Sequence, residues 1–266
     1  MSGEMVPILK EVAQVPGLLK EIYGDLAKPG VTQAGKALGT VLGLGNTILW
    51  PLMLLNERAK ITLEKNLEKY REELNKVPPA QISEVPPELG VPIAEKLGYV
   101  TDEQLSDLYI NLLAKASTTD FSHTAHPSFV NVINNLSPDE ALLLQHVTND
   151  LPFVEARLKK KSANEWRTLA ALITGLERTA KLSFPENCVA YFSNFEGLGL
   201  INIRHDLYIA DPPQYEKLEK YYRPILECVP HDKEMWEFMF ERGKIEVTPY
   251  GELFISACLR KLKARE

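Results

Sequence analysis

Two stretches near the C-terminal end decide the predicted fold: FEGLGLINI at residues 195–203 and IEVTPYGELFISAC at residues 245–258. Gly197 and Gly199 follow a helical pattern, and glycine readily adopts the positive φ that ends a helix. The segments Leu-Ile-Asn-Ile and Ile-Glu-Val-Thr have the composition of short strands. Thr248 is followed directly by proline, which predicts an N-cap and the start of a final helix. The two stretches therefore predict the order helix, strand, strand, helix.

This order resembles that of the winged-helix domains, in which a helix ending in Gly-Leu-Gly-Leu-Ile leads into the wing. The resemblance implies a winged-helix-like domain with a small β wing at residues 137–266. Its recognition helix would be CVAYFSNFEGLG, residues 188–199, which carries Glu196 but no lysine or arginine. Phosphate contacts need cations, and base readout most often uses arginine or lysine. We therefore expect this domain to contact protein, with a nucleic-acid-binding regulator as the alternative.

The rest of the chain predicts a mainly α protein, with N-terminal apolar and amphipathic helices and a helical middle. Apolar residues recur at helical spacing, and capping sequences open two of the helices. The segments expected to be helical are residues 1–28, 56–76, 105–116, 128–136, 138–147, 165–182, 188–196 and 213–222. Five prolines between Val77 and Pro92 predict that no helix crosses this stretch. We expect an N-terminal helical region at 1–77, a proline-rich linker and helical domain at 78–136, and the winged-helix-like domain at 137–266.

Composition and charge exclude several classes of protein. The 266 residues include 45% hydrophobic and 25% charged residues, which suffices for a packed core and excludes global disorder. The net charge of -6, from 30 basic and 36 acidic side chains, excludes a strongly basic nucleic-acid-binding chain. The 3 cysteines form no CxxC pair, which argues against structural zinc and iron–sulfur clusters and favours a reducing compartment. We therefore expect a cytoplasmic protein that can associate with the inner face of a membrane.

A long uncharged segment, Ala37–Leu55, precedes a highly charged helix. It is marginal as a membrane span, because a span needs about 20 mostly apolar residues and the glycines, Asn46 and Pro51 oppose insertion. Small residues four apart allow helices to approach closely, and the opposite apolar side can enter acyl chains or a protein core. The residues expected to contact lipid or a second copy of the chain are Gly35, Gly39, Gly43, Leu38, Leu42, Leu49 and Leu52. A buried or interfacial helix is the open alternative.

Few side chains suggest chemistry. His123 and His126 lie near Asp120, but a catalytic zinc site needs at least a third protein ligand and an activated water. Cys188 begins a helix, where the pKa of a thiol is often lowered, yet no histidine partner can be assigned to it. No phosphate-binding loop, GxGxxG or GxSxG motif occurs. We expect no enzyme activity, no metal and no cofactor, with a hydrolase that uses His123, His126 or Cys188 as the alternative.

One cationic run stands out, Arg157-Leu-Lys-Lys-Lys161. Such a run is commonly the solvated end of a helix. Alternatively, Arg157, Lys159, Lys160 and Lys161 contact phosphate groups or anionic lipid. Both interpretations are open at this point.

Several long phrases of the sequence resemble a known family. They are GKALGTVLGLGNTILWPLMLLNERAKI, EVPPELGVPIAEKL, LYINLLAKAS and AHPSFVNVINNLSPDEA. They resemble the abortive infection alpha (Abi-alpha) family, a bacterial domain of unknown function, over residues 31–147, and more loosely toward the C-terminal end. The resemblance implies anti-phage defence and supplies no catalytic residues. We therefore expect a non-enzymatic defence protein that binds membrane lipid, a phage component, another protein partner or a second copy of itself.

Overall fold

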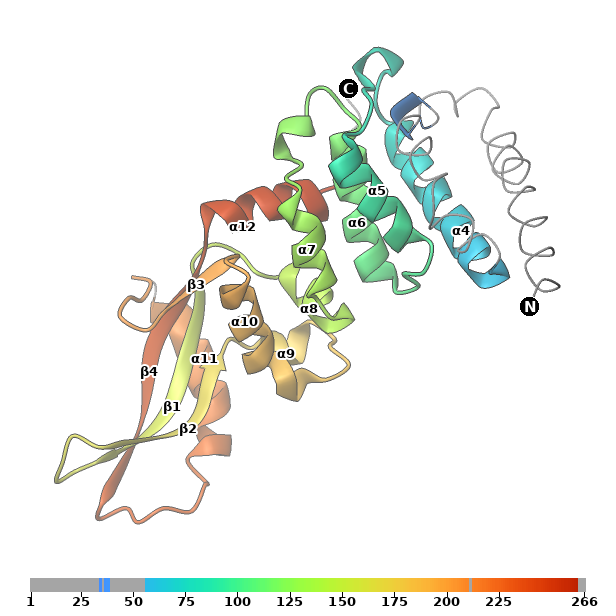
Figure 1. Cartoon of the computed structure of the whole chain (residues 1–266). Helices are drawn as coiled ribbons and strands as arrows, with labels where there is room; N and C mark the ends of the chain where they lie inside the picture. The colour runs from blue at the N-terminus through green and yellow to red at the C-terminus, as the bar shows by residue number, and fades with distance from the viewer. Residues whose placement is uncertain (1–33, 35, 39–55, 211, 263–266) are drawn as a thin grey trace, which may run out of the picture. The chain divides into compact units, whose positions relative to one another are not determined.

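Figure 1 shows the chain as a computed structural model, in which residues 34, 36–38, 56–210 and 212–262 are described. The chain divides into two compact units, residues 1–138 with 253–266 and residues 139–252. Within the described ranges, no helix is long and apolar enough to cross a membrane. Most of the expected lipid-contacting set lies outside these ranges, namely Gly35, Gly39, Gly43, Leu42, Leu49 and Leu52.

The first unit is built from helices. They are α4 (Glu57–Leu74), α5 (Pro87–Leu97), α6 (Glu103–Ala116) and α7 (Ser128–Asn134), with 3-10 turns at Pro79–Gln81 and Ser122–Thr124 and a π-helical turn at Ile255–Leu259. The side chain of Asn56 accepts hydrogen bonds from the amides of Arg58 and Ala59 and so caps the start of α4. One face of α4 is then buried, through Leu63, Leu67, Tyr70 and Leu74.

The proline-rich stretch differs from its prediction. Pro87 opens α5 and Pro92 lies inside this helix, so the expected absence of a helix across Val77–Pro92 is wrong for its second half. Pro92 cannot donate an amide hydrogen bond within the helix. The apolar face that includes Leu89 and Ile93 is buried, and this packing compensates for the missing bond.

The second unit contains a four-stranded antiparallel sheet in the order β2-β1-β4-β3 (Figure 1). Its strands are β1 (Leu151–Lys160), β2 (Trp166–Ile173), β3 (Ile201–Arg204) and β4 (Trp236–Val247). Its helices are α9 (Leu176–Thr179), α10 (Cys188–Gly197) and α11 (Pro212–Leu226), and α8 (Pro138–Leu144) and α12 (Pro249–Phe254) lie at its two ends. Helix α11 packs on one face of the sheet, where the core consists of Val154, Ala156, Ile173 and Tyr215.

The prediction of a winged-helix-like domain with a small β wing at residues 137–266 is wrong. The segment expected to be one helix at 165–182 instead contains strand β2 followed by the short helix α9, and the last strand begins at Trp236 rather than at Ile245. The Leu-Ala-Ala-Leu segment of β2 has helical propensity. Pairing with β1 and packing against α11 override that propensity.

Local signals at one end of the sheet are confirmed. Helix α10 ends at Gly197, and Gly199 has a φ of 74°, in the left-handed region that favours glycine. The hydroxyl of Thr248 donates a hydrogen bond to the carbonyl of Gly199 at 2.6 Å and accepts one from the amide of Gly251 at 2.9 Å. Thr248 therefore caps α12, as the sequence predicts.

Candidate functional site

The cationic run lies on a β-hairpin and not at a helix end. Arg157, Lys159 and Lys160 are in β1, and Lys161 begins the turn that leads into β2. Every residue from 161 to 168 is exposed. Within β1, Arg157 and Lys159 lie on one face of the sheet, because side chains alternate along a strand.

Arg157 is committed to holding the sheet together. It forms ion pairs with Glu155 of its own strand and with Glu241 of β4. These two glutamates are directly opposite each other across the β1–β4 pair, where like charges repel. The Glu155 side chain is only 7% exposed, so the charge of Arg157 compensates for a carboxylate that has lost most of its water. His205 Nδ1 lies 3.7 Å from the same carboxylate.

The three lysines of the run have different surroundings. Lys160 Nζ pairs with the carboxylate of Glu165 at 2.8 Å across the hairpin turn. Lys161 Nζ donates to the backbone carbonyl of Lys233 at 2.8 Å. Lys159 has no acidic partner among the described residues, and its ammonium lies 4.9 Å from the centre of the Trp166 ring. Of the four expected anion-contacting side chains, Lys159 and Lys161 therefore form no ion pair within the described residues, and Lys159 is the one that lies beside Trp166 with Glu237 as its neighbour in β4.

Trp166 is the centre of an exposed patch on this hairpin. It is the cross-strand neighbour of Lys159, its residue is 39% exposed, and the guanidinium of Arg157 lies 5.9 Å from its ring centre. The next residue, Arg167, is exposed, lies opposite Leu158 on the other face of the sheet, and has no acidic partner in the described parts of the chain. Met235 is 49% exposed, and its carbonyl accepts the amide of Lys161. We call Lys159, Trp166, Arg167 and Met235 the hairpin surface.

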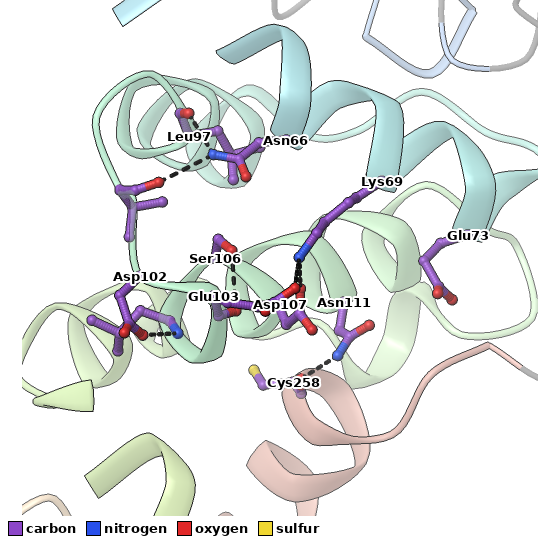
Figure 2. A network of polar contacts seen from close by, with 12 residues as sticks. Asn66, Lys69, Glu73, Leu97, Asp102, Glu103, Ser106, Asp107, Asn111 and Cys258 are labelled. Atoms are coloured by element: carbon purple, nitrogen blue, oxygen red, sulfur yellow. Dashed lines mark hydrogen bonds and ion pairs between the residues drawn. The ribbon is translucent and has the colours of Figure 1, made fainter. Parts of the chain in front are cut away.

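A second polar cluster connects α4 and α6 in the first unit. Figure 2 shows Lys69 of α4 directed at two carboxylates of α6, with Nζ 2.9 Å from Glu103 and 2.8 Å from Asp107. Burial alone would lower the pKa of Lys69, but its hydrogen bonds to Asp107 and Glu103 outweigh burial and raise that pKa. The group thus stays charged and paired, which is the behaviour of a structural clamp.

Buried amides of the same cluster are also satisfied. Asn66 Nδ2 donates to the backbone carbonyl of Leu97 at 2.8 Å, and Asn111 Nδ2 donates to that of Cys258 at 2.8 Å (Figure 2). Asp102 caps α6 by accepting a hydrogen bond from the amide of Leu105. Because these donors are bound to main-chain oxygens, the cluster fixes helix packing and offers no reactive group.

Two further ionisable side chains, Glu73 and Lys115, are buried in the first unit. One oxygen of Glu73 pairs with Lys76 at 2.5 Å, and the other makes no hydrogen bond to any described residue. The Lys115 ammonium lies 4.5 Å from the ring centre of Phe121. Burial lowers the pKa of Lys115, and attraction to Glu73 partly opposes this. A catalytic base must be reachable by its substrate, and Lys115 is only 5% exposed.

The side chains considered for chemistry lie apart from one another. His126 Nδ1 contacts Ser128 Oγ at 2.7 Å, and His123 lies in the preceding 3-10 turn. Within the described ranges, no group of three or more histidine, cysteine, aspartate or glutamate side chains could hold a metal ion. Burial, followed by the nearby charge of Glu177, raises the pKa of Cys188 to about 12, opposite to the lowering expected at a helix start. Leu38, the described member of the lipid-contacting set, is buried.

The sequence analysis missed Trp166 and Arg167. Both lie in the segment expected to be helical, and in a helix Trp166 would not be placed beside the cationic run. Because this segment forms a strand, the register of β2 against β1 places Trp166 directly opposite Lys159. The available signal was Trp166, one of 3 tryptophans in the chain, which follows shortly after the cationic run Arg157–Lys161.

Comparisons with known proteins identify the family. The chain belongs to the abortive infection alpha family, whose model matches residues 62–258 and so confirms the expected resemblance. The family name points to a role in abortive infection. No curated protein matches the chain.

One solved structure is similar to part of the chain. It is the structure of an uncharacterized protein from the hydrocarbon-degrading marine bacterium Alcanivorax borkumensis SK2. The identity is 13%, the match covers 54% of this chain and 99% of the other, and the TM-score is 0.28. A score this low supports no conclusion about fold or function.

Proposed function

We propose that this member of the abortive infection alpha family acts in anti-phage defence as a non-enzymatic protein that binds an acidic protein partner through the hairpin surface. The observation that carries the proposal is the exposed Trp166 with Lys159 over its ring, and Arg167 next to it in β2 on the other face of the sheet; neither cation forms an ion pair with a described residue. Tryptophan and arginine are the residues most enriched at the energetic centres of protein interfaces.

The charge distribution favours a protein partner over nucleic acid or a lipid surface. Polyanions are bound by many available cations, each of which releases counterions. Here Arg157, Lys160 and Lys161 already have partners, and the whole chain carries a net charge of -6. One cation beside the Trp166 ring and a second, Arg167, on the other face of the hairpin suit one or two carboxylates of a protein better than a polyanion.

The proposal of a non-enzymatic role rests on where the reactive side chains lie. Burial raises the pKa of the thiols of Cys188 and Cys258, so the nucleophilic thiolate is disfavoured at neutral pH. Lys115 has a lowered pKa but is buried behind Phe121. We therefore assign the defence role to binding, which uses exposed side chains.

A phage challenge with matched charge reversals tests the proposal. The test variant is Lys159→Glu with Arg167→Glu, and the control is Lys217→Glu with Lys220→Glu, which makes the same change of charge on the exposed side of α11. Against a phage that the wild-type chain restricts, the test variant should lose at least tenfold of the protection, and the control should keep it. Circular dichroism and thermal melting of both variants establish that they are folded.

Two results would overturn the proposal. Full protection by the folded test variant would show that the hairpin surface is not used. Alternatively, wild-type protein that binds a DNA duplex or phosphatidylglycerol vesicles at physiological salt, with that binding lost in the test variant, would replace the acidic protein with a polyanion.

A further inference from the structure

Three side chains form a row across one face of the sheet. Trp166 of β2, Lys159 of β1 and Glu237 of β4 are cross-strand neighbours, and these three strands lie side by side (Figure 1). Residues that are directly opposite each other in an antiparallel pair point to the same face. Glu237 and Trp166 are exposed, so the row presents an aromatic ring, a cation and a carboxylate to a partner.

Glu237 differs from the other acidic side chains that β1 and β4 place on this face. Glu155 and Glu241 both form ion pairs with Arg157. Glu237 forms no ion pair or hydrogen bond within the described ranges, although Lys159 is its direct neighbour. The Lys159 ammonium lies over the Trp166 ring instead. The row therefore holds an unpaired cation next to an unpaired carboxylate.

A partner that covers the Trp166 ring and reaches Lys159 also covers Glu237, because neighbouring strands lie only about 4.8 Å apart. Covering a carboxylate removes its water, and a covered charge that finds no partner destabilises the complex. A partner that brought only carboxylates to this row would in addition face repulsion from Glu237. Binding is therefore favourable only when a donor reaches Glu237.

That donor must come from the partner. If Lys159 turned from the ring to Glu237, the two charges would neutralise each other, and this row would offer no cation to a carboxylate of the partner. Arg167 cannot replace Lys159 here, because it lies on the other face of the sheet. Lys159 can bind a carboxylate of the partner only while another group satisfies Glu237.

We propose that Glu237 determines the specificity of the hairpin surface: the partner presents a carboxylate to Lys159 and, beside it, a basic side chain to Glu237. A phosphate backbone brings only negative charge to this row and is disfavoured by the same carboxylate. The inference rests on the proposed function and adds the charge pattern of the acidic partner.

A charge series at Glu237 tests the inference in the phage challenge. We expect Glu237→Gln to lose at least threefold of the protection and Glu237→Lys at least tenfold, whereas Glu237→Asp keeps the carboxylate and should protect like the wild type. The matched controls are Glu227→Gln and Glu227→Lys, which change an exposed glutamate just after α11 and should also protect like the wild type. Circular dichroism and thermal melting establish that all variants are folded.

The order of the variants separates paired recognition from simple attraction to an acidic partner. Simple attraction strengthens as the hairpin becomes more positive, so it predicts that Glu237→Gln and Glu237→Lys protect as well as the wild type or better. That result, or an equal loss in Glu237→Asp and Glu237→Gln, would overturn the inference.

The inference and the proposed function fail in different ways. If Lys159→Glu with Arg167→Glu loses protection while Glu237→Gln and Glu237→Lys retain it, the hairpin surface remains the functional site and only the proposed charge pattern is wrong. If the folded Lys159→Glu, Arg167→Glu variant protects fully, the proposed function itself fails, and the inference fails with it.

Discussion

Replacing Gly243 with alanine should destabilise the second unit strongly. A Cβ at this position of β4 would lie 2.2 Å from Cζ of Phe153 and 2.8 Å from the backbone carbonyl oxygen of Arg204. Phe153 is 1% exposed, so its ring has no space into which to move. The carbonyl of Gly243 also accepts a hydrogen bond from the buried Tyr215 hydroxyl at 3.0 Å, which a shift of β4 would lengthen.

The magnitude follows from overpacking of a close-packed core, which typically costs about 1–3 kcal/mol. We expect the upper end, about 3 kcal/mol, because a backbone atom and a buried ring both obstruct the new methyl group. For a chain of this size, each kcal/mol lost lowers the midpoint of thermal unfolding by about 2–4 °C, so the midpoint should fall by roughly 6–12 °C.

The assay is urea unfolding followed by circular dichroism, with Gly197→Ala as the control. Gly197 is the last residue of α10, and a Cβ there meets nothing within 4 Å. At such a site alanine stabilises by about 0.4–1 kcal/mol, because it restricts the unfolded chain. The two substitutions should therefore shift the urea midpoint in opposite directions. Equal shifts, or a stabilised Gly243→Ala, would refute the packing of β4 against Phe153.

Three more predictions concern other parts of the structure. Burial alone would raise the pKa of Asp139, but hydrogen bonds from two backbone amides and a tyrosine hydroxyl outweigh it and lower that pKa below its ordinary value of 3.8. Its ionisation therefore adds stability that is complete above about pH 4 and is lost as the pH falls through the lower folded value, so wild-type stability should decline below pH 4 more steeply than that of Asp139→Asn in acid-dependent urea unfolding. Thr248→Ala removes the cap of α12 and should cost about 1 kcal/mol in the same assay, and an unchanged midpoint would contradict the capping role. A thiol-reactive disulfide reagent at pH 8 should modify the exposed Cys228 rapidly and should reach the buried Cys188 and Cys258 only in denaturant, so equal rates for all three would contradict their burial.

The features that sequence predicts correctly here depend on neighbours in the chain. The Gly199 turn and the Thr248 cap are specified within a few residues, since each needs only a special φ or a nearby amide. Helix α6 is likewise predicted by the helical spacing of its apolar residues, and every residue from Leu108 to Ala116 is buried.

The sheet could not be predicted in the same way, because its partners are distant in the chain. β1 pairs with β4 in a register that joins Leu151 to Ile245 and Lys160 to Trp236. No local pattern in either strand encodes this pairing. Residues 166–173 read alone have the composition of a helix, and they become a strand only because β1 lies beside them.

The same strand pairing explains why the sequence predicted the cations of the candidate site but not Trp166 and Arg167. As a run of letters, the four cations from Arg157 to Lys161 look equivalent, and all of them are candidates for an anion. The sheet makes them unequal, since Arg157 forms ion pairs with Glu155 of its own strand and Glu241 of β4, whereas Lys159 lies over the ring of Trp166 and forms no ion pair within the described residues, although Glu237 is its neighbour in β4. If a cation that neutralises a buried carboxylate moves away, the carboxylate is left buried and unpaired, which costs several kcal/mol. A cation that lies over an exposed aromatic ring can turn toward a partner at a cost of only about 0.5–1 kcal/mol. The side chains that β4 and β2 place beside each residue of β1 therefore decide which cations of the hairpin can bind a partner. For this reason we assign the function to Lys159, Trp166 and Arg167 and not to the whole cationic run.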